Sequence, residues 1–348
     1  MDLLRFIAAV LILFHHYQQV FGIRFSNINF WGGRINVGFL TELFFMISGF
    51  LTVMSTKGKP QGYWSIRNCL KAWLHRMVRI YPMAVLACLS YLMMAYLYRR
   101  MTGAWPDDLC DYSDLKTIAA SLLLLFCGIP GLYMIGINNP AWYLCILLLC
   151  YHVFFFIKFL TDRYRLREIW FFAGMILLAE YGLKIRFVWI FFMGNARRGY
   201  IAFFLGVLLA VICARLKRNT VKKICKALDA VTVLSALALL ISGRWEKAVE
   251  LQYQLEVYYL YPLLLLNIFS FDNIEYKPIR RLGEISFEIY LWHAPMFVFL
   301  KIVLAGLAVP LPEGPVIMIL TALTVTLWAI PMAYCLEKPL AAKLRLLL

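Results

Sequence analysis

The chain has 348 residues, of which 63% are hydrophobic, and its mean hydropathy is +0.75. This composition excludes a soluble globular protein. Apolar runs of spanning length recur along the chain and predict an all-α, polytopic membrane helical bundle. The formal charge of +16 does not indicate nucleic-acid binding, because the basic residues cluster in loops between the apolar runs. The nine cysteines form no C-x-x-C pair or metal-ligand spacing, so we predict neither a metal site nor a disulfide framework.

The apolar runs predict about ten transmembrane helices in a single domain over residues 1–348. The first run lacks a preceding basic stretch and a small-residue cleavage site, so we interpret it as a retained span rather than a signal peptide. The predicted spans are 3–22, 37–56, 77–98, 141–160, 168–183, 198–215, 227–243, 256–272, 285–305 and 316–336.

One further apolar run, 115–135, is ambiguous because Gly128, Pro130 and Gly131 would break a helix late in it. If this run does not cross the membrane, the loops on one side carry about twice as many Lys and Arg residues as those on the other. If it does cross, the asymmetry disappears. We therefore predict a re-entrant or surface segment, with both termini on the cytoplasmic side of the cell membrane.

The first predicted span contains Arg5 and His16. Burying an arginine in a span costs at least ~2.5 kcal/mol, so such a residue is expected to have a partner or a function. Eleven positions correspond to about three turns and roughly 16 Å along a helix, so the two side chains share one face. His16 is the leading candidate for a general base. The alternative is a core histidine that hydrogen-bonds a neighbouring span.

Glu42 lies at the start of the second predicted span, in the run ELFFMISGF. An intramembrane carboxylate indicates a functional site by default. We expect Glu42 to orient the His16 imidazole or to pair with Arg5 or Arg34. The alternative is a carboxylate at the water interface. In the same run, Gly49 would allow another helix to approach closely.

Arg76 and Arg79 begin the third predicted span from the cytoplasmic side. They are three positions apart and so share a helix face. Two arginines at a membrane mouth suit the capture of phosphate groups. The alternative is ordinary anchoring by positive residues at the cytoplasmic interface.

Later parts of the chain supply further candidate substrate-binding residues. Trp142 opens the fourth span with aromatic residues at the expected interface. Tyr290 and His293 lie in the span from 285, where His293 is either a site residue or a packing group. Glu337 ends the last span, where it could pair with Arg76 or Arg79 or simply cap the structure.

Taken together, these residues resemble the membrane acyltransferase-3 family over nearly the whole chain. The family patterns are D-x-x-R-x-I-A with a later histidine, G-[VF]-[DE]-L-F-F-x-[IL]-S-G-F, R-x-x-R-[IV]-Y-P, W-[YF]-L, I-S-[FY]-x-[IL]-Y-L-x-H and E-x-P. Each pattern is weak alone, and together, in order, they are specific. The matching residues are Asp2, Arg5 and His16; Gly38 to Phe50; Arg76 to Pro82; Trp142 to Leu144; Ile285 to His293; and Glu337 to Pro339.

The chain departs from the family patterns at two places. Some members carry a glutamate that would fall at Leu147, so we assign no catalytic role to that segment. Extra residues separate Gly38 from Glu42, so Glu42 is carried over less securely than Arg5 or His16.

The resemblance implies an O-acyltransferase of the cytoplasmic membrane that moves an acetyl group from acetyl-CoA to a hydroxyl of an exported or cell-surface polysaccharide. It implies that Arg76 and Arg79 hold the CoA phosphates, and that His16 acts as general base or as an acyl relay, with Arg5 and Glu42 completing the catalytic set. The expected partners are the lipid bilayer, acyl-CoA, the glycan acceptor and proteins of a glycan-assembly pathway. The alternative functions are a flippase for lipid-linked glycans and a non-enzymatic scaffold. The absence of a visible internal repeat disfavours a flippase.

Overall fold

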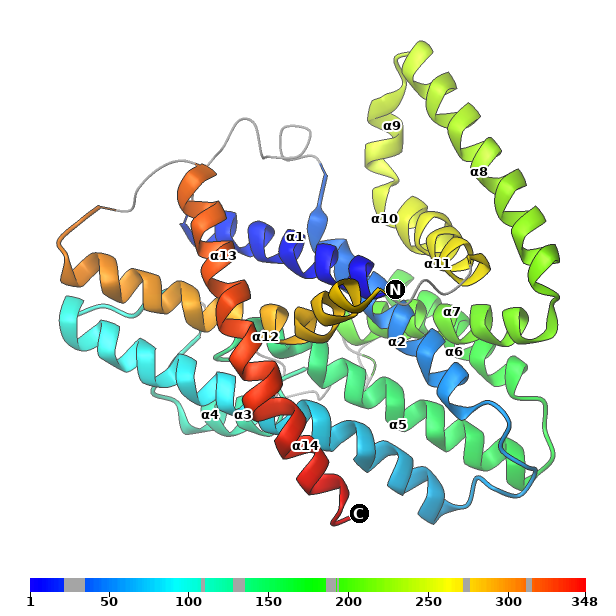
Figure 1. Ribbon diagram of the computed structural model, residues 1–348, viewed down its shortest axis with the longest axis horizontal. Helices are drawn as coiled ribbons and strands as arrows, with labels where there is room; N and C mark the ends of the chain where they lie inside the picture. The colour runs from blue at the N-terminus through cyan, green and yellow to red at the C-terminus, as the bar shows by residue number, and fades with distance from the viewer. Residues whose placement is uncertain are drawn as a thin grey trace.

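The computed structural model describes residues 1–21, 35–107, 110–127, 135–185, 192, 194–271, 276–310 and 315–348, and the elements assigned within these ranges are all helical. Figure 1 shows their arrangement as a bundle of long helices. In chain order the described elements are α1 (Asp2–Phe21), η2 (Val37–Phe39), α2 (Leu40–Thr56), α3 (Ile66–Thr102), α4 (Leu115–Leu122), η3 (Asn139–Ala141), α5 (Trp142–Arg163), α6 (Glu168–Lys184), α7 (Asn195–Arg215), α8 (Arg218–Ile241), α9 (Trp245–Glu250), α10 (Gln252–Leu255), η4 (Glu256–Leu260), α11 (Tyr261–Ser270), α12 (Lys277–Gly306), α13 (Pro315–Pro331), η5 (Met332–Glu337) and α14 (Lys338–Arg345).

Eight of the described helices are long and apolar enough to cross a membrane. The other two predicted spans are also helical: α6 has 17 residues, and the region 252–270 is a series of α10, η4 and α11. The prediction of an all-α polytopic membrane protein is therefore confirmed. Which side holds the termini stays a prediction.

The ambiguous run 115–135 contains only the short helix α4 in its described part. Eight residues of α-helix span about 12 Å, well short of the ~30 Å hydrocarbon core. Asp114 caps the start of α4 by accepting hydrogen bonds from Thr117, and these bonds lower the pKa of the Asp114 carboxyl below its usual value. The predicted helix breakers Gly128, Pro130 and Gly131 lie outside the described residues.

Helices α2 and α7 pack together at glycines. A methyl group at Gly49 would lie 2.0 Å from the Phe203 carbonyl oxygen, and one at Gly206 would lie 2.0 Å from the Met46 carbonyl oxygen. Only glycine tolerates so close an approach, as predicted for Gly49. The two helices consequently form the tightest crossing among those that carry candidate site residues.

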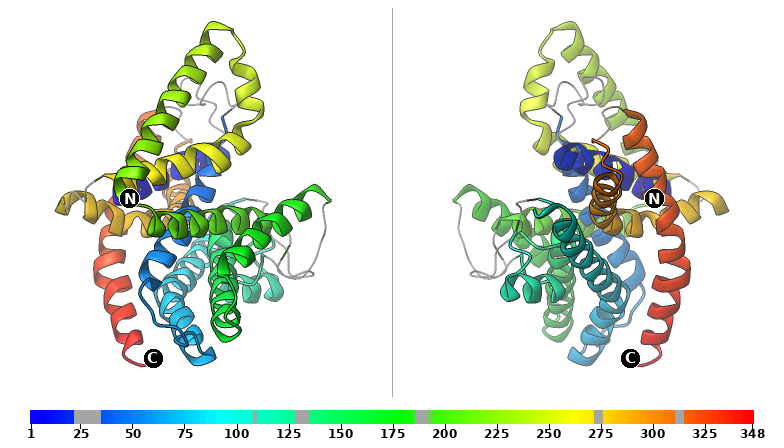
Figure 2. Two further views of the ribbon diagram at one scale, coloured as in Figure 1. Left: turned by 90° about the vertical axis from the view of Figure 1, so that its right-hand side faces the viewer. Right: turned by 90° about the vertical axis from the view of Figure 1, so that its left-hand side faces the viewer.

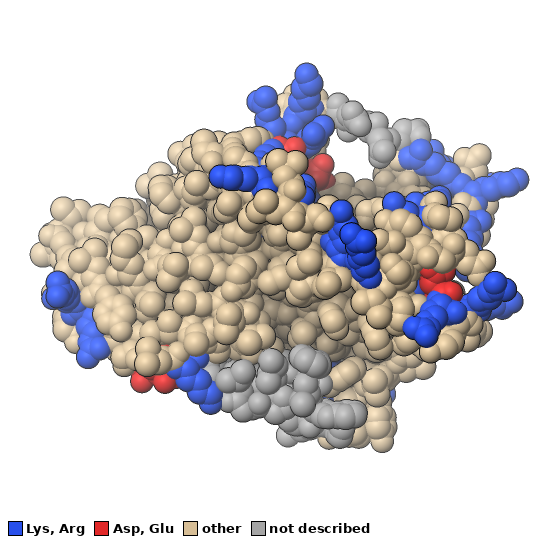
Figure 3. Space-filling view, turned by 90° about the horizontal axis from the view of Figure 1, so that it is seen from below, with Lys and Arg blue, Asp and Glu red and all other residues tan. Residues whose placement is uncertain are grey.

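Other parts of the molecule are much less enclosed. Helices α8 and α9 project from the rest of the bundle (Figures 1 and 2), and most α8 side chains outside its first turns are exposed. In Figure 3, many Lys and Arg side chains gather toward the right-hand end, where α2 ends and α3 begins, whereas much of the left half is uncharged. This distribution agrees with the segregation of basic loops in the sequence.

Candidate functional site

A cavity of about 430 Å³ lies between α1, α2, α3, α5, α12 and α14. We call it the basic cavity because its wall carries several cationic or titratable nitrogen groups. Its deeper wall is apolar and aromatic. The basic lining residues are Arg5, His75, Arg76, Arg79 and Arg345, and the aromatic ones include Phe44, Tyr143 and Tyr290.

Arg76 faces the basic cavity without a carboxylate partner in the described part of the chain. Its guanidinium donates to the Ser55 hydroxyl at 3.0 Å and to the backbone carbonyl of Ala72 at 3.2 Å. The same group lies over the rings of Tyr151 and Phe155, 5.1 Å and 4.9 Å from the ring centroids. Arg76 is therefore held in place by neutral groups and keeps its charge available to an anion.

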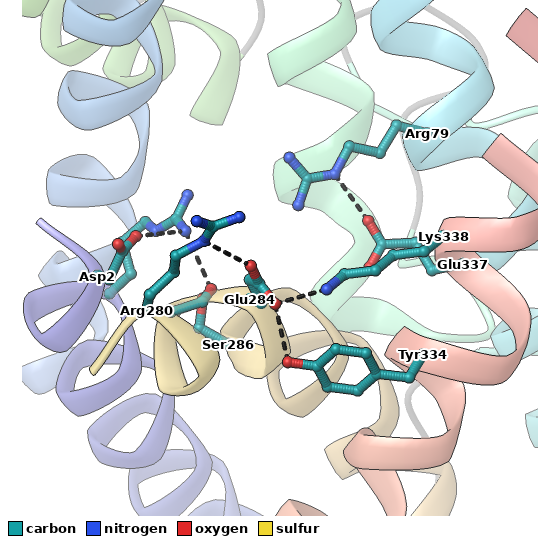
Figure 4. A network of polar contacts seen from close by, with 10 residues as sticks. Asp2, Arg79, Arg280, Glu284, Ser286, Tyr334, Glu337 and Lys338 are labelled. Atoms are coloured by element: carbon teal, nitrogen blue, oxygen red, sulfur yellow. Dashed lines mark hydrogen bonds and ion pairs between the residues drawn. The ribbon is translucent and has the colours of Figure 1, made fainter. Parts of the chain in front are cut away.

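Arg79, by contrast, is neutralised by Glu337. The Arg79 Nε donates to a Glu337 carboxylate oxygen at 2.7 Å (Figure 4). The Glu337 side chain is 4% exposed and the Arg79 side chain is 44% exposed, so the arginine faces the cavity while the carboxylate lies behind it. Of the two partners that the sequence offered Glu337, the structure selects Arg79. The second Glu337 carboxylate oxygen is buried and has no hydrogen-bond partner among the residues that the structure describes.

Arg5 reaches the same cavity from the start of α1. It donates to the Asp2 carboxylate and to the Gly283 carbonyl of α12, each at 3.0 Å. A Cβ at Gly283 would lie 2.3 Å from Asp2, so glycine is what lets α1 and α12 approach here. Arg5 thus has its partners within the protein, as the cost of its burial requires.

Glu288 was not singled out in the sequence, yet it is fully buried on α12 close to this network. It accepts a hydrogen bond from the Trp292 indole at 2.9 Å, and its other oxygen has no hydrogen-bond partner in the described part of the chain. It interacts electrostatically with both Glu337 and Arg79. Its signal in the sequence was an acidic residue within an apolar run, which is itself a functional indicator.

Two histidines from different helices stack beyond the deep wall of the cavity. His16 of α1 and His293 of α12 have ring centroids 5.1 Å apart and nearly parallel planes. The His293 ring also lies against the ring of Tyr290, which lines the cavity, and their ring centroids are 5.9 Å apart. The sequence predicted that Arg5 and His16 share one helix face. In the structure Arg5 lines the basic cavity, whereas His16 does not line it and is connected to the lining residue Tyr290 through His293 of α12.

His16 lies within hydrogen-bond distance of Gln19. The Gln19 side-chain oxygen is 3.0 Å from His16 Nδ1, and the Gln19 side-chain nitrogen is 3.1 Å from His15 Nε2. In the tautomer that carries the proton on Nδ1, His16 donates to Gln19 and its Nε2 keeps a free lone pair. The buried His293 ring has no hydrogen-bond partner at either nitrogen within the described residues.

Glu42 pairs with an arginine that the sequence did not suggest. Arg198 of α7 contacts one Glu42 oxygen at 2.6 Å, and Thr41 donates to the other at 2.8 Å. The predicted partners were the His16 imidazole, Arg5 and Arg34. Arg34 lies outside the described residues, and Arg5 has the other partners described above. Trp142 lies beside this pair, with its ring centroid 5.9 Å from the Arg198 guanidinium carbon. It is not among the residues that line the basic cavity.

A cavity lined by basic side chains thus lies beside Tyr290, whose ring contacts His293, and His293 in turn stacks on His16. Among the described residues, no group of His, Cys, Asp or Glu could hold a metal ion. A family model described as an acyltransferase domain matches residues 1–335 of the chain. No curated protein and no solved structure matches the chain significantly.

Proposed function

Because the chain belongs to this acyltransferase family and is a membrane acyltransferase, we propose that it transfers an acetyl group from cytoplasmic acetyl-CoA to a hydroxyl of an exported or cell-surface polysaccharide. The polysaccharide classes that fit are exopolysaccharide, capsule and O-antigen. The observation that carries the proposal is the basic cavity, whose deep aromatic wall leads to the stacked histidines.

The basic cavity suits the donor in both charge and shape. CoA carries phosphates at one end and a slender, largely neutral pantetheine arm at the other. Arg76 and Arg345 would hold the phosphates at the mouth, with Arg79 joining them if it releases Glu337. Arginine binds phosphate oxygens in a bidentate manner. The pantetheine arm would extend along Phe44 and Tyr143 toward Tyr290.

His16 would act on the acceptor hydroxyl. In the proposed step, His16 Nε2 takes the hydroxyl proton while the oxygen attacks the thioester carbonyl. The carbon–sulfur bond breaks, a carbon–oxygen ester bond forms, and the CoA thiolate leaves and receives the proton that His16 took from the hydroxyl. General base catalysis of this kind contributes on the order of 10²–10⁴-fold. The alternative route within this proposal is transfer through an acyl-His16 intermediate, which would use the same nitrogen.

Arg5 and Glu42 support the site in different ways. Arg5 lines the cavity and would position the donor end of the substrate. Glu42 has both oxygens occupied by Arg198 and Thr41, which supports a role in positioning α2 against α7 rather than direct contact with the reacting atoms. His293 would support the His16 ring by stacking.

The experiment compares His16→Ala with His152→Ala in membranes supplied with labelled acetyl-CoA. His152 is an exposed histidine on α5 outside the cavity lining, so it controls for the loss of an imidazole. We expect acetyl incorporation into glycan to fall by at least ~10²-fold in His16→Ala only. Full activity in that variant would exclude the mechanism. A flippase would move glycan without consuming thioester, so free CoA release in the wild type separates the two functions.

A further inference from the structure

A second hollow lies near the loops that join α2 to α3 and α5 to α6. It has a volume of about 1080 Å³ and shares no lining residue with the basic cavity. We call it the interfacial cleft. Its charged lining residues are Lys59, Lys158, Asp162, Arg165, Arg167, Glu168 and Arg215, and its apolar ones include Leu166, Ile169, Trp170, Leu208 and Ile212.

The acidic residues of the interfacial cleft are already used by the protein. The two Asp162 carboxylate oxygens accept from the backbone N–H groups of Gly62 and Trp64 at 2.9 Å and 2.7 Å. Glu168 accepts from Lys158 at 2.5 Å. These bonds fix the two loops and pair Glu168 with Lys158, and neither acid forms an ion pair with an arginine of the cleft among the described residues.

The arginines of the cleft differ from Lys158, which is ion-paired with Glu168. Arg165, Arg167 and Arg215 are exposed, and none of them has an ion pair within the described residues. They come from the α5–α6 loop and from the end of α7, so separate elements bring them to one hollow. Such a hollow attracts a group with several negative charges or several anionic oxygens.

The rim of the cleft distinguishes a lipid from a soluble anion. Trp170 is 70% exposed and Ile212 is 44% exposed, and both lie beside the arginines. The apolar surface continues along α6 through exposed Leu177 and Leu178. A soluble phosphate would gain no favourable contact with this apolar surface, whereas the acyl chains of a phospholipid would cover it. Tryptophan is typical of headgroup depth.

We propose that the interfacial cleft binds the phosphate headgroup of an anionic phospholipid, with the acyl chains lying along the exposed face of α6. The arginines contact the headgroup oxygens, and Trp170 lies at the boundary between headgroup and chains. Basic pockets between spans on the cytoplasmic side are suited to such headgroups. This site requires no acyl transfer and stands independently of the proposed enzymatic function.

The test replaces Arg165, Arg167 and Arg215 together by Gln in the full chain. The control replaces Arg67, Lys223 and Lys226 by Gln, which removes the same charge from exposed positions outside the cleft. Each protein is placed in nanodiscs of phosphatidylcholine with a small fraction of phosphatidylglycerol, and retained phosphatidylglycerol is counted by native mass spectrometry. We expect a loss of roughly fivefold in affinity per arginine in the cleft variant, and little change in the control.

Two results would overturn the proposal. Equal losses in both variants would mean that phosphatidylglycerol responds only to total charge. Displacement of the lipid by inorganic phosphate or free CoA at matched concentration would mean that the cleft is a site for soluble anions. Because the readout is lipid retention without donor or acceptor, it can fail while acetyl transfer is present, or succeed while acetyl transfer is absent.

Discussion

Two buried carboxylates each pair with an arginine in this protein, but the two pairs are built differently. The pair between Arg198 and Glu42, here the crossing pair, has every carboxylate oxygen bonded. The pair between Arg79 and Glu337, here the cavity pair, leaves one Glu337 oxygen without a hydrogen-bond partner within the described ranges. The crossing pair joins α2 to α7 near glycine contacts, whereas the cavity pair joins α3 to the π-helical turn η5.

The difference separates a fixed interaction from one that can be exchanged. A satisfied, enclosed pair gains nothing from rearrangement, because any change leaves a buried charge uncompensated. An arginine that is 44% exposed to a cavity can turn toward an incoming phosphate. π-Helical turns such as η5 also occur frequently at functional sites. We therefore interpret the crossing pair as structural and the cavity pair as part of donor binding.

The largest effect is expected from closing the space at the α2–α7 crossing. In Gly206→Ala the new methyl would overlap the Met46 carbonyl, so the helices must separate and the crossing pair with them. We expect loss of most folded protein, measured by fluorescence-detected size-exclusion chromatography. The control is Gly174→Ala on α6, where a Cβ meets nothing within 4 Å. A normal elution profile for Gly206→Ala would contradict the interpretation of a rigid crossing.

The next effect comes from removing the arginine of the crossing pair. Arg198→Ala leaves Glu42, which is fully buried, without a cation. Breaking a buried pair in this way costs ~3–5 kcal/mol. We expect a clear drop in the unfolding temperature and no change in the KM for acetyl-CoA of the protein that remains folded. A raised donor KM at unchanged stability would show instead that Arg198 contacts the donor.

Removing the arginine of the cavity pair is expected to raise the KM for acetyl-CoA as well as to lower stability, because Arg79→Gln also leaves the buried Glu337 without its ion-pair partner. Arg79→Gln removes one charge from the phosphate end of the basic cavity, where a charge-assisted hydrogen bond is worth ~1.5–3 kcal/mol. We expect the KM for acetyl-CoA to rise about 10–100-fold by the same principle, with a smaller fall in kcat. Arg280→Gln is the matched control, since Arg280 is exposed on α12 and lies outside the cavity lining. Equal KM values in the two variants would show that Arg79 does not take part in donor binding.

The sequence predicted most of the fold, because apolar runs and basic loops report directly on membrane spans. It also predicted that Gly49 permits close packing and that Arg79 is a possible partner of Glu337. It could not select Arg198 for Glu42, because the partners are 156 positions apart and only the α2–α7 crossing brings them together. The stacking of His16 on His293 likewise depends on how α1 and α12 pack.

Glu288 shows a different kind of limit. An acidic residue in an apolar span is a recognisable signal by itself. Glu288 falls at an unspecified position of the motif from Ile285 to His293, so the resemblance gives it no role. Only the structure shows that Glu288 accepts a hydrogen bond from Trp292 and interacts electrostatically with both Glu337 and Arg79.

Glu288 therefore offers the finest test of the cavity pair. Ionising it would place a second buried carboxylate beside Glu337, and Arg79 is already paired with Glu337, so we expect the neutral acid. Glu288→Gln keeps the shape and the acceptor for Trp292, and should change stability by less than ~1 kcal/mol. Glu288→Ala leaves the Trp292 N–H buried without a partner and should cost ~1–3 kcal/mol.

Thermal unfolding of the two Glu288 variants, with the KM for acetyl-CoA measured on each, decides between the two protonation states. If Glu288 is the neutral acid, the Gln variant matches the wild type in both measurements and the Ala variant is destabilised. If Glu288 is ionised, the Gln variant removes its repulsion of Glu337 and gives a protein more stable than the wild type. In that second case Arg79 is shared between two carboxylates, and the cavity pair would be as firmly held as the crossing pair.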